Sequence, residues 1–184
     1  MWVVGIAMDV VFYLCYLSRG FNKGDKMAFW LMKSEPSVYS LDDLKKTGTT
    51  PWEGVRNYQA RNIMRDDMSV GDLVLFYHSN AKPTGAVGVG RVSAEAYPDH
   101  FAWKKGSKYF DARSTPEKPV WMMVDVDYVC HFPEIASLAD MKEDPALEDM
   151  MVIRRGSRLS VQPVEKKHFQ HVCRMGGLPG IPKA

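Results

Sequence analysis

Short apolar runs separated by turn residues dominate the pattern along this chain. Residues 28–32 form a compact apolar run that predicts a buried strand, and residues 86–92 predict another strand. Residues 73–78 are apolar almost without interruption, which predicts a strand buried on both faces. Glycines within residues 86–92 indicate a close backbone approach or a bend in a barrel. Residues 120–129 alternate between apolar and polar positions, as in a long strand. We therefore expect several strands joined by turns.

The helices predicted between these strands are short. Residues 41–46 form the clearest one, because Ser40 is a suitable N-cap, acidic residues occupy the first turn and Gly48 follows the end. Other helical segments are predicted from Asn62 to about Met68, within 133–141, within 145–150 and over 165–173. A hairpin-like turn is expected at Gly156, leading into a strand. Without a strand–helix–strand rhythm, the pattern predicts an α+β fold around a small twisted β-barrel with short peripheral helices.

The first residues differ from the rest of the chain. Residues 1–17 are rich in large apolar side chains, but no positive charge precedes them and Asp9 interrupts them. We favour an N-terminal extension over residues 1–26, with a membrane anchor or a packed extra element as alternatives. The domain is then expected over residues 27–175. The Gly- and Pro-rich residues 176–184 are predicted to be a loose tail.

Composition excludes several classes of protein. The 184 residues fit one domain, and 46% hydrophobic with 25% charged residues is ordinary for a globular protein. A net charge of +2 excludes a uniformly basic surface, so any phosphate site must come from local clusters of arginine. The three cysteines, Cys15, Cys130 and Cys173, have no C-x-x-C spacing. They predict reduced thiols in a cytoplasmic or nuclear setting rather than a disulfide framework or a zinc site.

The segment Trp52–Asn62 concentrates the chemistry that a nucleotide requires. It combines aromatic rings, guanidinium groups and side-chain amides in eleven residues. Aromatic planes stack on a base, amides hydrogen-bond its edge, and arginines bind phosphate. We therefore expect Trp52, Arg56 and Tyr58 to surround one accessible cleft. Asn57 has an equally good alternative role as a helix cap.

Other candidates lie where strands end. Lys33 and Ser34 follow the first strand, where a barrel rim would place them, although they also fit a simple turn. Trp30 is either a stacking wall or a core residue, and His78 is more often a structural histidine than a ligand-binding one. The full set expected to bind a base is Trp30, Lys33, Ser34, Trp52, Val55, Arg56, Asn57, Tyr58, Tyr77, His78 and Ser79.

A second set is expected to contact phosphate or backbone. It comprises Arg61, Asn62, Arg154, Arg155, Arg158 and Ser160. The alternative for such a charged run is a solvated surface. Lys104, Lys105 and Lys108 lie beside aromatic residues and fit a flexible basic loop better than a binding strip.

Catalytic patterns are scarce in this sequence. Cys130 and His131 are only neighbours in sequence, and Asp125 and Asp127 are best explained as exposed acids on an edge strand. Glycines within 85–90 lack the lysine and the helix of a phosphate-binding loop. Neither a deaminase pattern nor a nucleophile elbow is present. We expect no metal, no cofactor and no catalysis. A nucleic-acid-processing enzyme and a sensor of free nucleotides are the alternatives.

Four motifs in order resemble the EVE domain. They are Phe29–Pro36, Trp52–Asn62, Gly71–Asn80 and Val152–Val161, and together they extend over about residues 28–175. The resemblance implies a PUA-like fold, a twisted β-barrel related to the YTH and ASCH domains. It also implies a pocket for one modified base, in particular a modified cytosine in DNA. Residues 1–26 have no counterpart in this pattern. Whether the partner is DNA or RNA stays open.

Overall fold

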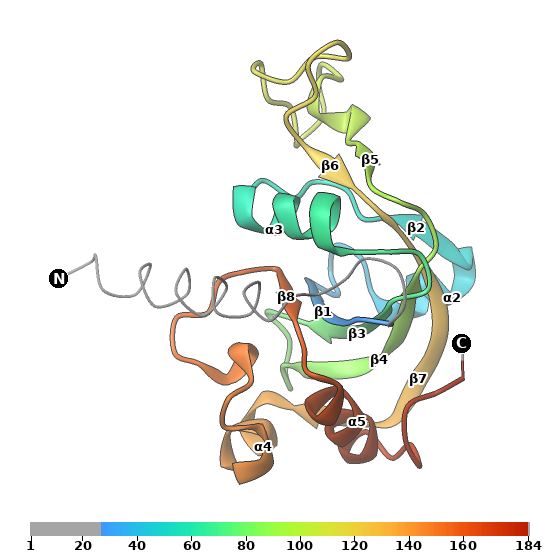
Figure 1. Ribbon diagram of the computed structural model, residues 1–184, viewed down its shortest axis with the longest axis vertical. Coiled ribbons are helices and arrows are strands. Elements are labelled where there is room, and N and C mark those ends of the chain that lie inside the picture. Colours follow the sequence, from blue (N-terminus) through green and yellow to red (C-terminus); the bar gives the residue numbers. More distant parts are fainter. Residues whose placement is uncertain (1–26, 184) are drawn as a thin grey trace, which may run out of the picture.

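The computed structural model describes residues 27–183. The extension predicted over residues 1–26 lies outside the described residues. One mixed sheet organises the domain, with the strand order β2-β7-β4-β3-β1-β8 (Figure 1). Its strands are β1 (Phe29–Ser34), β2 (Thr49–Pro51), β3 (Leu73–His78), β4 (Gly85–Val92), β7 (Asp125–Ser137) and β8 (Val161–Pro163). A separate two-stranded sheet pairs β5 (Tyr97–Pro98) with β6 (Met122–Met123).

The helices are short, as predicted. They are α2 (Leu41–Thr47), α3 (Tyr58–Asn62) with a π-helical continuation (Ile63–Asp67), α4 (Leu138–Glu143) and α5 (Lys166–Met175). Single 3-10 turns occupy His100–Ala102, Pro145–Leu147 and Met151–Ile153. The predicted cap of α2 is confirmed, because Ser40 and Asp43 form a reciprocal capping box and Gly48 ends the helix at φ 79°.

The sheet curls because its central strands contain bulges and glycines. β3, β4 and β7 pair antiparallel, and the register between β4 and β7 shifts twice. At Gly88 an added Cβ would lie 2.3 Å from the carbonyl oxygen of Cys130 and 2.5 Å from the side chain of Leu41. The predicted close backbone approach is therefore confirmed at this position. β1 pairs parallel with β3 and antiparallel with β8, which makes the sheet a mixed half-barrel.

Apolar side chains are buried on both faces of the sheet, as the uninterrupted run at residues 73–78 predicted for its strand. One cluster contains Trp30, Val74 and Phe76 and packs against α2 and α3. The other contains Leu31 and Leu75, and α4 and α5 cover it (Figure 1). Successive residues of β1 and β3 thus alternate between two cores, which explains why neither strand shows a polar face.

Three segments differ from the sequence-based expectation. β7 continues through Pro133 to Ser137, inside the range 133–141 where a helical segment was predicted, because Phe132 and Ala136 are buried in the cluster beneath α5. The turn at Gly156 is present with φ 81°, but it does not form a hairpin, because β8 pairs with β1. In the tail, Leu178 and Ile181 pack against the second cluster rather than extending away from it.

Candidate functional site

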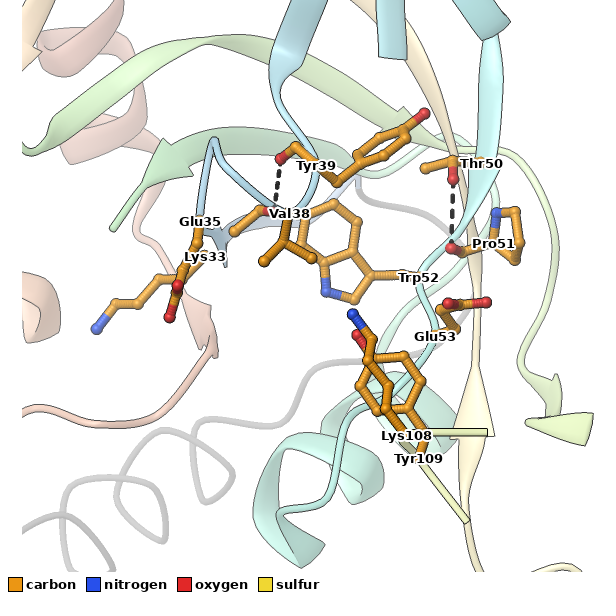
Figure 2. A pocket seen from close by; sticks show the side chains of 11 residues that line it. Lys33, Glu35, Val38, Tyr39, Thr50, Pro51, Trp52, Glu53, Lys108 and Tyr109 are labelled. Atoms are coloured by element: carbon orange, nitrogen blue, oxygen red, sulfur yellow. Dashed lines mark hydrogen bonds between the residues drawn. The ribbon is translucent and has the colours of Figure 1, made fainter. Parts of the chain in front are cut away.

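A cavity of about 550 Å³ lies between the end of β1, the turn that follows it, β2 and the loop before β6. We call it the aromatic pocket, and Figure 2 shows its side chains. Its lining consists of Lys33, Ser34, Glu35, Val38, Tyr39, Thr50, Pro51, Trp52, Glu53, Lys108 and Tyr109. Segments far apart in the sequence therefore meet around one opening.

Trp52 forms the central wall of this pocket. Its backbone N–H donates to the carbonyl of Val124 (2.8 Å), which extends the edge of β2. The indole contacts the ring of Phe76 edge-on, with centroids 5.4 Å apart. Only 8% of Trp52 is exposed, so the core holds the ring in place while part of it stays open to the pocket.

Hydrogen bonds within the turn opposite Trp52, and from this turn to neighbouring segments, hold it in place. Ser34 Oγ donates to the carbonyl of Tyr39 (2.7 Å), and the phenol of Tyr39 bonds with Thr47 Oγ1 (2.8 Å). The carboxylate of Glu35 accepts from the amide of Asn80 (2.7 Å). These three polar side chains are therefore occupied in shaping the pocket.

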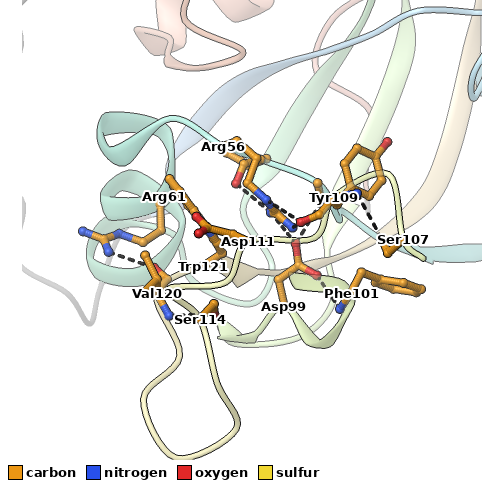
Figure 3. A network of polar contacts seen from close by, with 12 residues as sticks. Arg56, Arg61, Asp99, Phe101, Ser107, Tyr109, Asp111, Ser114, Val120 and Trp121 are labelled. Atoms are coloured by element: carbon orange, nitrogen blue, oxygen red, sulfur yellow. Dashed lines mark hydrogen bonds and ion pairs between the residues drawn. The ribbon is translucent and has the colours of Figure 1, made fainter. Parts of the chain in front are cut away.

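Arg56 fastens the far wall instead of lining the pocket. Its Nη1 donates to the carboxylate of Asp99 (2.8 Å), and its Nε donates to the carbonyl of Tyr109 (3.0 Å; Figure 3). Asp99 is fully buried and also accepts from the backbone N–H groups of Gly54 and Phe101, at 3.0 Å each. A buried carboxylate with this many donors fixes the loop that presents Tyr109.

The predicted grouping of Trp52, Arg56 and Tyr58 around one cleft is therefore corrected, because only Trp52 lines the aromatic pocket. Tyr58 lies on α3 and stacks against Trp121, with ring centroids 4.9 Å apart, while the guanidinium of Arg61 lies 4.9 Å from the Tyr58 ring. Half of Tyr58 is exposed, so it faces solvent beside the Arg56 network and not the pocket.

Neighbouring residues of the same segment serve the fold. Asn57 caps α3 by accepting from the N–H groups of Gln59 and Ala60, so its alternative role as a helix cap is the one observed. Val55 is buried in the core. The side chain of Asn62 accepts from Arg61, which also donates to the carbonyl of Val120 (2.8 Å).

Two further candidates are structural in the same sense. Trp30 is 2% exposed, and its indole N–H donates to Asp72 (2.8 Å), which places it in the core and not on a pocket wall. His78 accepts a hydrogen bond from the N–H of Leu41 (3.2 Å) through Nε2 and so anchors the start of α2. Burial lowers the pKa of His78, which favours the neutral ring that this bond requires.

A second cavity of about 400 Å³ lies where β1 and β3 end, next to α4 and the turn at Gly156. We call it the basic hollow. Its lining is Lys33, Tyr77, Ser79, Asn80, Thr84, Leu138, Lys142, Val152, Arg154, Arg155, Gly156, Ser157 and Arg158. Lys33 lines both cavities, and its Nζ donates to the carbonyl of Ser157 (3.0 Å).

The charge of the basic hollow is one-sided. Its described lining contains five cationic side chains and no carboxylate. Within residues 27–183, neither Arg155 nor Arg158 has a hydrogen bond or an ion pair. Gln162 braces the turn that presents these arginines by donating to Ser157 Oγ (2.9 Å) and to the carbonyl of Leu159 (2.7 Å). A concave surface with unpaired guanidinium groups suits an anion such as phosphate.

Of the remaining candidates at this end of the sheet, two line the basic hollow with their side chains and one contributes only a backbone carbonyl. Tyr77 and Ser79 line the basic hollow. Burial raises the pKa of Tyr77 to about 12, so the phenol stays protonated. Ser160 contributes its carbonyl, which accepts from the N–H of Lys33 (2.8 Å), and its side chain is not part of the lining.

Sequence reasoning missed several residues of the aromatic pocket. Tyr39 and Thr50 carried no distinguishing signal, because each lies in an ordinary polar context. Glu53 lies inside the Trp52–Asn62 segment, but its acidic side chain was not among the groups expected to bind a base. Burial raises the pKa of the Glu53 carboxyl, and the charge of Asp99 acts in the same direction. Lys108 was expected on a flexible loop, yet its ammonium lies 4.6 Å from the Tyr109 ring centroid at the pocket wall.

The described part of the chain contains neither a metal-binding cluster nor a membrane-spanning helix. Over residues 27–183, His, Cys, Asp and Glu side chains form no group of three or more that could hold a metal ion. In the same range, no helix has the length and apolar character needed to cross a membrane.

Comparison with known proteins connects this geometry to a family. The family model of the EVE domain matches residues 28–175. Thymocyte nuclear protein 1 of Homo sapiens is 39% identical over 162 residues, which cover 78% of this chain and 71% of the human protein. The protein of the same name from Gallus gallus is 40% identical over 162 residues, covering 78% and 66%. The chain thus spans about two thirds of the length of these relatives.

Solved structures show the same fold. A hypothetical protein from Leishmania major has a TM-score of 0.80 at 45% identity, covering 84% of this chain and 98% of its own. The human THYN1 protein, solved in complex with DNA that contains 5-methylcytosine, has a TM-score of 0.75 at 37% identity and covers 84% and 99%. The α+β, PUA-like fold predicted from the sequence is confirmed.

Proposed function

Because this chain belongs to the EVE domain family, we propose that it binds nucleic acid and receives a single modified base in the aromatic pocket. The observation that carries this proposal is the pocket itself. Its volume of about 550 Å³ is in the range of ligand sites, and its walls contain an indole, two phenol rings and charges of both signs. The complex of human THYN1 with 5-methylcytosine-containing DNA supports the same assignment.

The base reaches the pocket after it leaves its strand. Extrusion from a duplex costs a few kcal/mol, and the cost is smallest for unpaired or damaged bases. Stacking on an aromatic ring returns about 1–3 kcal/mol per base, so contact with Trp52 is of the right size to offset extrusion. Val38, which is 56% exposed at the pocket rim, adds apolar surface where the base enters.

The basic hollow holds the backbone of the same strand. Lys33 lies in the lining of both cavities, so a base in one and a phosphate in the other are neighbours on one chain. Arg155 and Arg158 supply cations that the described residues do not neutralise. These phosphate contacts do not depend on sequence and weaken as salt is added.

The role we propose is recognition without catalysis, inside the cell. Incubation of the protein with labelled modified DNA, with and without divalent metal ions, tests the first part. Intact DNA after incubation is the expected result, whereas strand cleavage or base release assigns the protein to the alternative class of nucleic-acid-processing enzymes. Comparable affinity for a mononucleotide and for an oligonucleotide would instead indicate a nucleotide sensor.

Replacing the central wall tests the pocket directly. We expect Trp52→Ala to weaken binding to an oligonucleotide with 5-methylcytosine by about 5- to 150-fold, because the stacking surface is removed. The measurement is a fluorescence anisotropy titration at fixed salt, comparing DNA with RNA. Thermal unfolding of the same variant checks that it is folded at the assay temperature. A folded Trp52→Ala protein with unchanged affinity would remove the aromatic pocket from the proposal.

A further inference from the structure

Most polar side chains of the aromatic pocket are already hydrogen-bonded to the protein. Ser34, Tyr39 and Glu35 bond to the carbonyl of Tyr39, to Thr47 and to Asn80, respectively. Thr50 Oγ1 donates to the carbonyl of Pro51 (3.4 Å). These groups have little remaining capacity to distinguish one ligand from another.

Two consecutive residues are exceptions. The indole N–H of Trp52 has no hydrogen-bond partner within residues 27–183, and it is not among the unpaired atoms that are sealed from solvent. In Figure 2 the nitrogen edge of this ring is turned away from Tyr39, toward the side of the pocket where Glu53 and Lys108 lie. The ring therefore offers a donor as well as a stacking surface.

Glu53 is the complementary group. Its carboxylate lines the same pocket and has neither a hydrogen bond nor an ion pair to any described residue. Partial burial raises the pKa of Glu53, and the negative charge of the fully buried Asp99 raises it further. The positive charges of Lys108, His100 and Arg56 act in the opposite direction. A desolvated acceptor without a partner is costly unless a ligand supplies a donor.

We infer that the Trp52 indole N–H and the Glu53 carboxylate read the edge of the bound base and select bases that carry an exocyclic amino group. This inference rests on the proposed function. Cytosine presents an amino donor beside a ring-nitrogen acceptor, which matches one acceptor and one donor of the protein. Thymine presents a carbonyl beside a ring N–H, so both contacts would be mismatched. The 5-methyl group is common to 5-methylcytosine and thymine and cannot provide this discrimination.

This pair of bases allows a matched test. Single-stranded oligonucleotides that differ only in 5-methylcytosine or thymine at one position remove the difference in extrusion cost between paired bases. We expect the wild-type protein to bind the 5-methylcytosine oligonucleotide about tenfold more tightly. Equal affinity for the two would overturn the inference but leave the proposed function in place, whereas no binding to either would contradict both.

Two variants assign the selectivity to its residues. Glu53→Gln offers thymine an amide donor, so the tenfold preference should fall to about twofold or less while the fold is kept. Trp52→Phe keeps an aromatic ring and removes the N–H, so it should lower affinity for 5-methylcytosine more than for thymine. Glu134→Gln, an exposed position on β7, changes the net charge equally and should retain the preference. If both pocket variants keep the full preference for 5-methylcytosine over thymine, the assignment is overturned. If Glu134→Gln also loses this preference, the selectivity is a general effect of net charge and not of Glu53.

Discussion

The aromatic pocket and the basic hollow share Lys33 but differ in the charge and the aromatic content of their linings. The pocket balances its lysines with Glu35 and Glu53 and is walled by rings, whereas the described lining of the basic hollow is cationic without a carboxylate. The first arrangement tolerates a neutral, flat group with specific donors and acceptors. The second attracts a phosphate group, whatever the nucleotide sequence around it. In the function we propose, base discrimination and phosphate affinity therefore belong to neighbouring but separate surfaces.

The arginines of the two regions show how this separation is built. Arg56 is three-quarters buried and bound to Asp99 at 2.8 Å, so its charge is used inside the protein. Arg158 lines the basic hollow without a partner among the described residues. The same side chain stabilises a loop in one place and presents a charge in the other, and the presence or absence of a buried carboxylate decides which.

Removing the Asp99 carboxylate, the partner of Arg56, should have the largest effect among the substitutions that test this difference between the two regions. Asp99→Ala leaves the Arg56 guanidinium and two backbone N–H groups without an acceptor, and we expect it to lower the free energy of unfolding by about 3–5 kcal/mol. Urea unfolding followed by tryptophan fluorescence measures the change. Asp66→Ala removes a carboxylate from an exposed pair and should cost less than about 1 kcal/mol. Equal stability of Asp99→Ala and wild type would mean that Arg56 does not depend on this pair.

Removing cations from the basic hollow should have a smaller effect, limited to binding. We expect Arg155→Ala/Arg158→Ala to weaken oligonucleotide affinity by about tenfold at low salt. The slope of log affinity against log salt should also fall by about 0.7–0.9 for each phosphate that the variant no longer neutralises. Unfolding should be unchanged, because neither arginine has a described partner. Arg174→Ala on α5, outside both cavities, serves as the control. An unaltered salt slope in the double variant would exclude the basic hollow as a phosphate site.

The smallest expected effect concerns His78, which anchors α2 behind the aromatic pocket. Burial lowers the pKa of His78 from 6.5, so the unfolded chain binds a proton more readily than the folded one. Its contribution to stability is therefore complete above about pH 6.5 and is lost as pH falls through the lowered folded value. Urea unfolding at several pH values should show this decline.

The variant His78→Gln separates this effect from other histidines. Its amide oxygen can accept from the N–H of Leu41 without titrating, so the decline between about pH 7 and pH 5 should be shallower than in wild type. His168, whose pKa burial also lowers, remains in both proteins and cancels in the difference. Identical pH profiles for wild type and His78→Gln would show that His78 does not titrate in this range.

Much of this protein was determined by local sequence. The apolar runs identified β1, β3 and β4, and Ser40 with the acidic first turn defined the start of α2. The ordered motifs identified the EVE domain, and Trp52, singled out in the sequence, lines the aromatic pocket. Strand and helix periodicity and capping act over a few residues, so a single sequence window contains them.

Only the tertiary structure decided which candidates line a cavity. Arg56 anchors a loop because Asp99, 43 residues away in the sequence, is buried beside it. The same arginine donates to the carbonyl of Tyr109 and so holds this residue at the pocket wall. Trp30 and Trp52 both looked suitable for stacking, but Asp72 holds the first in the core while the second opens onto the cavity. Availability of a side chain depends on partners brought together by folding, and local sequence does not specify those partners.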